Sequence, residues 1–491
     1  MSARQPTLMS EDLAPVPLDR RRWGTWSMAA LWISMSACVP TYMSGSSLID
    51  GGMNWWQATL TIFLGNAIVL VPMIMNAHAG TKYGIPFPVL CRASFGTLGA
   101  NIPALMRAVV ACGWFGIQTW IGGWAIFKIS AVLVPDLLAW PVIPALGISL
   151  PEVMTFLLFW GVNIFFVVKG IDSIRILLQI KAPLLIALGL LLLWWAYSTA
   201  GGFGPMLSAP SKFEEGQEKA GQFSEFFPSA LTAMVGFWAT LSLNIPDFSR
   251  YAKSQKAQML GQAIGLPATM GLYSFIGIAV TSATVVIYGR TIWDPVDLLA
   301  QFTNPALLLI AMFALCLATL ATNLAANVVS PANDFANLAP GRISFKTGGI
   351  ITGIIGIIGI LIMPWKLIAD PSGYIFVWLV GYSALLGPIG GILICDYFVL
   401  RRRTLDIGDL YSPTGRYRYT RGFSIVALVA LFAGIAPSVP GFLATIKVVP
   451  ADAFPHIWHT LYGYSWFVGF GVAFTIYWVL RKTPAGHSSE H

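Results

Sequence analysis

Apolar stretches of about twenty residues recur from one end of the chain to the other, and they constrain its fold more than any other feature. A helix needs roughly 20 apolar residues to cross the hydrocarbon core of a bilayer. Only 10% of the 491 residues are charged, whereas soluble domains carry about 25%. We therefore expect an all-α polytopic membrane protein with about twelve transmembrane helices, near residues 26–48, 56–77, 104–132, 153–169, 175–199, 228–250, 259–288, 304–328, 347–369, 372–400, 422–446 and 461–480.

The distribution of basic residues predicts the orientation of these spans. Cytoplasmic loops of membrane proteins carry an excess of Lys and Arg. With twelve spans and both termini cytoplasmic, the basic residues fall on the cytoplasmic side, as Lys82, Arg92, Lys169, Arg175, Lys181, Arg250, Lys253, Lys256, Arg342, Lys346, the arginines of 401–421, Arg481 and Lys482. The opposite side receives 133–152, which has no Lys or Arg, and 200–227, which has four Glu and two Lys. Eleven or thirteen spans would move a basic cluster to the wrong side.

Several other classes of protein are disfavoured by what the chain contains. The net charge of +8 does not predict nucleic-acid binding, because the basic residues are spread over short loops rather than gathered on one face. Most of the five Cys lie in or beside apolar stretches, so we expect no disulfide framework. The sequence has no HExxH, P-loop or dinucleotide fingerprint. We therefore expect neither an enzyme nor a bound cofactor.

Two of the expected spans, the first and the sixth, are interrupted by proline. Pro40 falls about halfway through the first, and Pro246 follows a polar stretch in the second half of the sixth. Proline removes a helical hydrogen bond, and the freed backbone groups are tolerated in a membrane where they line a cavity. Interruptions at corresponding positions predict a five-plus-five inverted repeat with its binding site at the breaks. Two ordinary proline kinks are the alternative interpretation.

This interpretation divides the chain into seven segments. They are a cytoplasmic tail (1–25), a first repeat of five helices (26–199), an outer loop (200–227), a second repeat (228–400), a cytoplasmic loop (401–421), two further helices (422–480) and a second cytoplasmic tail (481–491).

A series of ordered motifs extends over nearly the whole chain, from about Trp23 to Lys482. The motifs are Ala79-Gly-Thr-Lys-Tyr-Gly-Ile-Pro-Phe-Pro88, Arg92-Ala-Ser-Phe-Gly96, Gly113-Trp-Phe-Gly-Ile-Gln-Thr-Trp-Ile-Gly122, Asn244-Ile-Pro-Asp-Phe-Ser-Arg250, Ala321-Thr-Asn-Leu-Ala-Ala-Asn327 and Asp396-Tyr-Phe398. In these motifs the chain resembles the nucleobase–cation symporter family, which includes allantoin, uracil, cytosine and hydantoin permeases. The resemblance implies cation-coupled uptake by alternating access, with the substrate between a bundle containing spans one and six and a scaffold containing spans three and eight.

The resemblance also implies a substrate site. Trp114, Gln118, Trp238 and Asn327 match substrate contacts in the family, and Cys38, Phe237, Gly236 and Asn323 are further candidates. Two indoles can hold a planar ring between them, and carboxamides can pair with the alternating C=O and N–H edge of a cyclic urea or imide. Such an uncharged site suits a small neutral heterocycle. Helix packing and interhelical hydrogen bonds are the alternative roles for these residue types.

The coupling ion is less well defined. The positions that match the sodium ligands of relatives are Ser34, Ala37, Ala318, Ala321 and Thr322. Ala321 replaces a second hydroxyl of the sodium-coupled relatives, and Cys38 stands where several relatives carry an amide. Coupling to Na⁺ or to H⁺ therefore stays open, as does the choice between a uracil-type and an allantoin- or hydantoin-type substrate. We expect a monomer surrounded by lipid in the plasma membrane, the inner membrane of a bacterium; a channel or a membrane-embedded enzyme are the competing classes.

Overall fold

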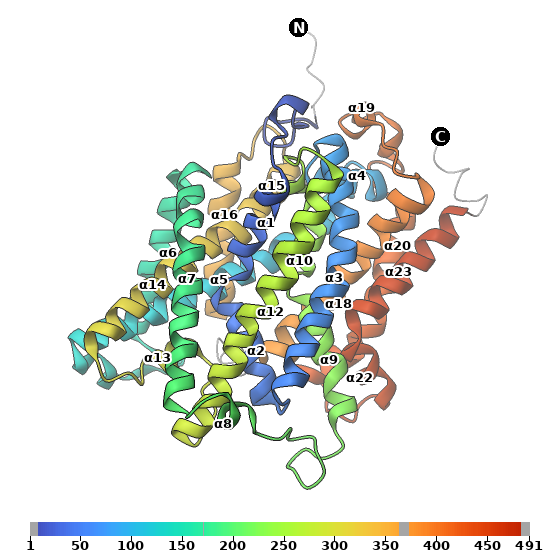
Figure 1. Ribbon diagram of the computed structural model, residues 1–491. Coiled ribbons are helices and arrows are strands. Elements are labelled where there is room, and N and C mark those ends of the chain that lie inside the picture. The colour runs from blue at the N-terminus through green and yellow to red at the C-terminus, as the bar shows by residue number, and fades with distance from the viewer. Residues whose placement is uncertain (1–7, 170, 363–372, 483–491) are drawn as a thin grey trace.

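The computed structural model describes residues 8–169, 171–362 and 373–482, and it is built almost entirely from helices (Figure 1). The first half contains η1 (Leu18–Arg20), α1 (Thr25–Ser36), α2 (Val39–Gly51), α3 (Trp55–Tyr83), α4 (Phe87–Phe95), α5 (Asn101–Leu133), η2 (Pro135–Ala139), β1 (Val142–Ile143), β2 (Ile148–Ser149), α6 (Leu150–Lys169), α7 (Ile171–Thr199) and α8 (Phe203–Leu207). The two short strands pair in antiparallel fashion and form a small hairpin between α5 and α6.

The second half contains the remaining helices and several shorter turns. They are α9 (Phe223–Gly236), α10 (Ala239–Asn244), α11 (Pro246–Ser249), α12 (Gln255–Tyr288), α13 (Pro295–Leu299), α14 (Pro305–Asn327), α15 (Val329–Leu338), α16 (Phe345–Ile362), the π-helical η3 (Gly373–Leu379), α18 (Val380–Ile394), the π-helical η4 (Cys395–Leu400), α19 (Ile407–Leu410), η5 (Arg416–Arg418), α20 (Ile425–Ile435), η6 (Ala436–Ser438), α21 (Val439–Thr445), α22 (His456–Gly463) and α23 (Ser465–Lys482).

By length and hydropathy, seven of the described helical segments can cross a membrane, or eight if the bent pair α22–α23 counts as one span. The count of twelve stays a prediction. The first and sixth expected spans consist of shorter helices, and the expected boundary between 347–369 and 372–400 lies outside the described residues. The division into repeats and loops likewise stays a prediction.

The helices of the first and sixth expected spans are interrupted. α1 ends at Ser36, and Ala37 and Cys38 are non-helical before α2 begins at Val39. Pro40 lies in the first turn of α2, where its missing N–H costs no helical hydrogen bond. In the sixth span α9 ends at Gly236, and α10 begins two residues after Phe237.

The packing brings the interrupted helices into the centre of the molecule. α12 packs along α1, α2 and α3, while α14 packs along α5 and α7. Figure 1 shows η1 and α19 at one end of the bundle and α8 and α22 at the other, with α23 returning from α22 toward the first end. The first and last described helices therefore reach the same end, as an even number of crossings requires.

Candidate substrate site

An aromatic cluster joins the third span to the interrupted sixth span. The ring of Phe237 makes edge-to-face contacts with Trp114 on α5 and with its neighbour Trp238, at centroid distances of 5.5 and 4.9 Å. Trp238 also makes an edge-to-face contact with Trp32 of α1, at 5.2 Å. All four side chains are buried. The structure therefore brings the two tryptophans of the expected site into one cluster, with Phe237 in contact with both.

The tenth span supplies three aromatic residues that the sequence analysis did not include. Trp114 contacts the rings of Tyr374, Trp378 and Tyr382 at 6.2, 5.9 and 6.4 Å, each in a steep edge-to-face arrangement. The three are spaced four residues apart, which places them along one side of the segment η3–α18. That spacing is the sequence signal that could have revealed them.

The carboxamides of the expected site differ in their surroundings. The Nδ2 of Asn323 lies 3.1–3.2 Å from three acceptors on α5 and α6, which are the Phe115 carbonyl, Thr119 Oγ1 and Asn163 Oδ1. Its Oδ1 accepts a hydrogen bond from Asn327 Nδ2 at 3.0 Å. Asn323 is thus held by the protein and orients Asn327.

Some buried polar atoms in this region have no hydrogen-bond partner among the described residues. They include Oε1 of Gln118, one helical turn from Trp114 on α5, and the indole nitrogens of Trp32, Trp238 and Trp378. Buried polar groups in proteins nearly always find a partner, and each one left without a partner costs about 1–3 kcal/mol. The region around the aromatic cluster therefore contains one amide acceptor and three N–H donors that have no partner among the described residues.

Gly236 is the last residue of α9, directly before the break in the sixth span, and Cys38 lies in the break of the first span. A Cβ at Gly236 would collide with Ser383 Oγ, and the Gly236 carbonyl accepts from the Tyr382 hydroxyl at 2.9 Å. Glycine is therefore required for close packing of α9 against α18. The Cys38 thiol lies 3.2 Å from Thr41 Oγ1 within the start of α2.

The candidate cation site lies between α1 and α14, which contact each other. Ser34 and Ala37 are at the end of α1, whereas Ala318, Ala321 and Thr322 are buried on α14, where the Thr322 hydroxyl donates to the Ala318 carbonyl at 3.0 Å. The Ser34 carbonyl accepts a hydrogen bond from Nζ of Lys181, which is fully buried on α7. The assignment of Lys181 to a cytoplasmic loop was wrong, because the lysine extends inward from the fifth span to the break in the first.

Two further charged residues of the bundle are buried. Arg107 on the third span is fully buried and pairs with the equally buried Asp334 of α15 at 3.4 Å. Asp247 is also buried, and its carboxylate accepts from the Phe87 amide at 2.9 Å. The first contact joins α5 to α15 and the second joins α11 to α4, near the end of the bundle where α4 and α15 lie (Figure 1).

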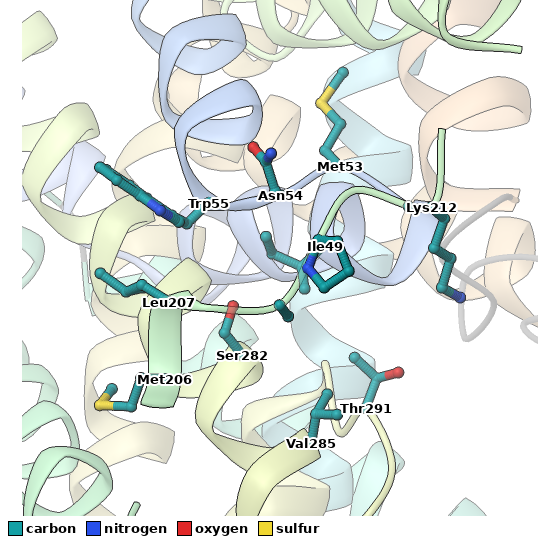
Figure 2. Close-up of a pocket in the computed structure, with 13 residues that line it drawn as sticks. Ile49, Met53, Asn54, Trp55, Met206, Leu207, Lys212, Ser282, Val285 and Thr291 are labelled. Carbon is teal, nitrogen blue, oxygen red and sulfur yellow. The ribbon is translucent and has the colours of Figure 1, made fainter. Parts of the chain in front are cut away.

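A pocket opens at the opposite end of the bundle, between the end of α2, the start of α3, α8 and α12 (Figure 2). Its volume is about 530 Å³, including the part open to solvent. Figure 2 shows Ile49, Met53 and Trp55 on one side and Ser282 and Val285 of α12 on another, and none of the lining residues belongs to the expected substrate site. The pocket lies at the C-terminal end of α2, whereas the helix break lies at the N-terminal end of α2.

The interrupted helices, the uncharged aromatic cluster and the buried carboxamides together define a secondary transporter of the inverted-repeat class. The chain belongs to the family described as permeases for cytosine and purines, uracil, thiamine and allantoin, whose model matches residues 15–469. It is 46% identical to the purine-uracil permease NCS1 of Arabidopsis thaliana over 99% of this chain and 80% of that protein. It is 40% identical to the allantoin permease of Bacillus subtilis over 98% of this chain and 95% of that protein.

Solved structures show the same fold. Mhp1, a nucleobase-cation-symport-1 family transporter in a closed conformation with bromovinylhydantoin bound, superposes with a TM-score of 0.77 at 26% identity, and 97% of each chain is covered. The inward-facing conformation of Mhp1 gives a TM-score of 0.78 at 25% identity, covering 99% of this chain and 96% of the other. The chain is therefore an integral membrane transporter that works by alternating access, and it is not an enzyme.

Proposed function

We propose that this transporter takes up a small, planar, uncharged nitrogen heterocycle, of the uracil type or of the allantoin and hydantoin type, together with a cation. The names of its relatives support this class of substrate, since they include a purine-uracil permease, an allantoin permease and a transporter with a bound hydantoin. We also propose that it acts as a monomer in the plasma membrane, with both termini cytoplasmic.

The observation that carries the proposal is the set of unpartnered polar atoms inside an aromatic cluster. The indole rings of Trp114 and Trp238 both pack against Phe237 in the cluster. Gln118 Oε1 lacks a hydrogen-bond partner among the described residues. A cyclic urea or imide has a flat face for the indoles and N–H groups for the amide oxygen. Its carbonyl oxygens can accept from the amide of Asn327 or from an indole N–H.

The interrupted helices explain how such a site can open to either side. The non-helical residues at 37–38 and 237–238 adjoin the aromatic cluster, because Trp238 contacts Trp32 and Phe237 contacts Trp114. Rocking of spans one, two, six and seven against the remaining helices would expose the cluster first to one face and then to the other. The substrate would then keep its hydrogen-bond partners in the cluster while access changes from one side of the membrane to the other.

Binding measurements on the purified protein test the proposal. Tryptophan quenching with uracil, allantoin, hydantoin, cytosine and uric acid should identify at least one saturable ligand. Trp114→Ala should abolish that binding, and Gln118→Leu should weaken it by about 1–3 kcal/mol, because a ligand N–H loses its acceptor. Trp194→Ala is the matched control for the indole, since Trp194 is 68% exposed on the outer face of α7 and should not affect affinity.

Two results would contradict the proposal. One is the absence of saturable binding by any of the five compounds to folded wild-type protein. The other is a folded Trp114→Ala variant that binds the identified ligand as well as the wild type does. Asn66→Ala serves as the control for Gln118→Leu, because Asn66 is a buried carboxamide on α3 that bonds within its own helix, to the Ile62 carbonyl.

A further inference from the structure

A tight turn connects η5 to α20, near α4 and α19 (Figure 1). Thr420 and Phe423 exchange two backbone hydrogen bonds of 3.1 Å across this turn. Between them, Arg421 and Gly422 both have positive φ angles, of 54° and 96°. A two-residue turn of this shape favours asparagine or glycine at its first central position. The left-handed conformation of Arg421 therefore costs free energy that asparagine or glycine would avoid.

Contacts with the connection between α4 and α5 hold the turn in place. The Gly422 carbonyl accepts from the Leu98 amide at 2.8 Å, and the Ser424 amide donates to the Phe95 carbonyl at 2.7 Å. A Cβ at Gly422 would collide with the Leu98 side chain, so the two segments pack closely. These contacts fix the backbone of the turn, and they hold the exposed Arg421 side chain at its tip.

An exposed apolar stripe begins directly after this turn. The exposed side chains Ile425, Val429 and Phe432 are three and four residues apart on α20, so they lie along one face of the helix. Because the chain is an integral membrane transporter, this face contacts the acyl chains of the bilayer. Arg421 lies four residues before Ile425, which places it where the acyl chains meet the lipid headgroups.

Two further cations adjoin the turn. Arg418 is exposed three residues before Arg421, and Lys482 is exposed at the end of α23. α23 packs along α20, and Arg481 donates to Ser424 Oγ at 2.9 Å, which brings the neighbouring Lys482 to the start of α20. Among the described residues, no carboxylate lies within 4.0 Å of the side-chain nitrogens of Arg418, Arg421 or Lys482. Three positive charges without a carboxylate partner in the described part of the chain thus adjoin a lipid-facing stripe.

We propose that the turn at 418–424 and the end of α23 form a binding site for the headgroup of an anionic phospholipid. Guanidinium groups donate paired hydrogen bonds to phosphate oxygens, and the acyl chains of the same lipid lie along the stripe on α20. A zwitterionic lipid has a cationic group beside its phosphate and therefore gains less from three protein cations. This role explains the strained conformation of Arg421, because the turn holds its guanidinium group at the depth of the lipid phosphates.

Lipid binding to the purified full-length transporter in detergent tests this site. Binding by native mass spectrometry and the melting temperature are measured with phosphatidylglycerol and with phosphatidylcholine, at low and at high salt. We expect phosphatidylglycerol to bind at least about tenfold more tightly and to raise the melting temperature, and we expect salt to weaken both effects. Inorganic phosphate at the same concentration should not raise the melting temperature, because it lacks acyl chains to cover the stripe.

Arg421→Asn separates the lipid site from the stability of the fold. Asparagine favours the left-handed conformation, so the melting temperature without added lipid should equal or exceed that of the wild type. Phosphatidylglycerol should nevertheless bind about fivefold more weakly, because one cation near the lipid surface is lost. Arg418→Gln should weaken binding to a similar extent.

Arg342→Asn is the matched control for Arg421→Asn. Arg342 is exposed in another connection, between α15 and α16, and no carboxylate among the described residues lies within 4.0 Å of its side-chain nitrogens. Its replacement removes the same charge from the chain, and we expect it to leave the affinity for phosphatidylglycerol unchanged.

Four results would overturn the inference. The first is equal affinity of the wild type for phosphatidylglycerol and phosphatidylcholine, and the second is wild-type affinity of the folded Arg421→Asn variant for phosphatidylglycerol. The third is an equal loss of affinity in Arg342→Asn, which would indicate a general attraction of anionic lipid to basic residues. The fourth is a rise in melting temperature with inorganic phosphate that matches the rise with phosphatidylglycerol, which would indicate a site for free anions. The comparison of lipids on the wild type holds even if a variant does not fold.

Discussion

Asn323 should act on substrate binding indirectly, by orienting Asn327. Its Nδ2 is within 3.2 Å of three acceptors on α5 and α6, and its Oδ1 accepts from Asn327 Nδ2 at 3.0 Å. Asn323→Leu keeps the volume of the side chain but removes both functions. The Asn327 carboxamide then loses the hydrogen bond that fixes its rotamer, while the side chain itself remains.

The expected loss of ligand affinity follows from the number of hydrogen bonds that each variant removes. One lost hydrogen bond to Asn327 corresponds to about 0.5–1.5 kcal/mol, or a two- to twelvefold weaker affinity for the identified ligand. Asn327→Leu removes the contacting group itself and should cost about 1–3 kcal/mol. Because Asn323 acts through Asn327, the double variant should bind no more weakly than Asn327→Leu, and the two single effects should not add.

Tryptophan quenching or isothermal calorimetry on the four proteins completes this double-mutant cycle. Asn163→Leu is the control, since it removes one of the acceptors around Asn323 Nδ2 but leaves the bond between Asn323 and Asn327. It should lower the melting temperature and change the affinity less than Asn323→Leu does. Additive losses, or a larger loss for Asn323→Leu than for Asn327→Leu, would refute a positioning role and indicate direct contact between Asn323 and the substrate.

Two further predictions concern stability. Arg107→Met should destabilise the protein by about 3–5 kcal/mol, because it leaves Asp334 as an unpaired buried charge. Adding Asp334→Leu should restore most of the lost melting temperature. A double variant that is no more stable than Arg107→Met would contradict this reasoning. Gly236→Ala should cost about 1–3 kcal/mol through overpacking against Ser383 Oγ, and Ser383→Ala should relieve part of the cost. Equal melting temperatures of Gly236→Ala and the wild type would show that the packing of α9 against α18 leaves room for a Cβ at this position.

The sequence predicted the interrupted spans because proline and glycine have local effects. Pro40 and Pro246 both lie in the first turn of a helix, α2 and α11, where a residue without an N–H is tolerated. The non-helical residues themselves lie elsewhere, at 37–38 and at 237–238. In the sixth span they directly follow Gly236, which packs closely against α18, a contact between distant segments that no local pattern contains.

The roles of buried charges could not be predicted in the same way. The partner of Lys181 is the carbonyl of Ser34, 147 residues away, and the partner of Arg107 is Asp334, 227 residues away. A basic residue near the end of an apolar stretch has the same local sequence whether it faces the cytoplasm or a neighbouring helix. Only the packing of α7 on α1, and of α15 on α5, determines which of the two applies.

The contacts at the break in the first span connect the proposed cation site to the proposed substrate site. Lys181 of the fifth span holds the Ser34 carbonyl on one side of the break, and Tyr374 of the tenth span donates to the Pro40 carbonyl at 3.3 Å on the other. The fifth and tenth expected spans therefore hold the break from both sides. Tyr374 also contacts Trp114, at 6.2 Å. A movement that breaks either bond changes the position of the helix break relative to Tyr374, which contacts Trp114, or relative to Lys181. We propose this as a physical route by which substrate and cation influence each other.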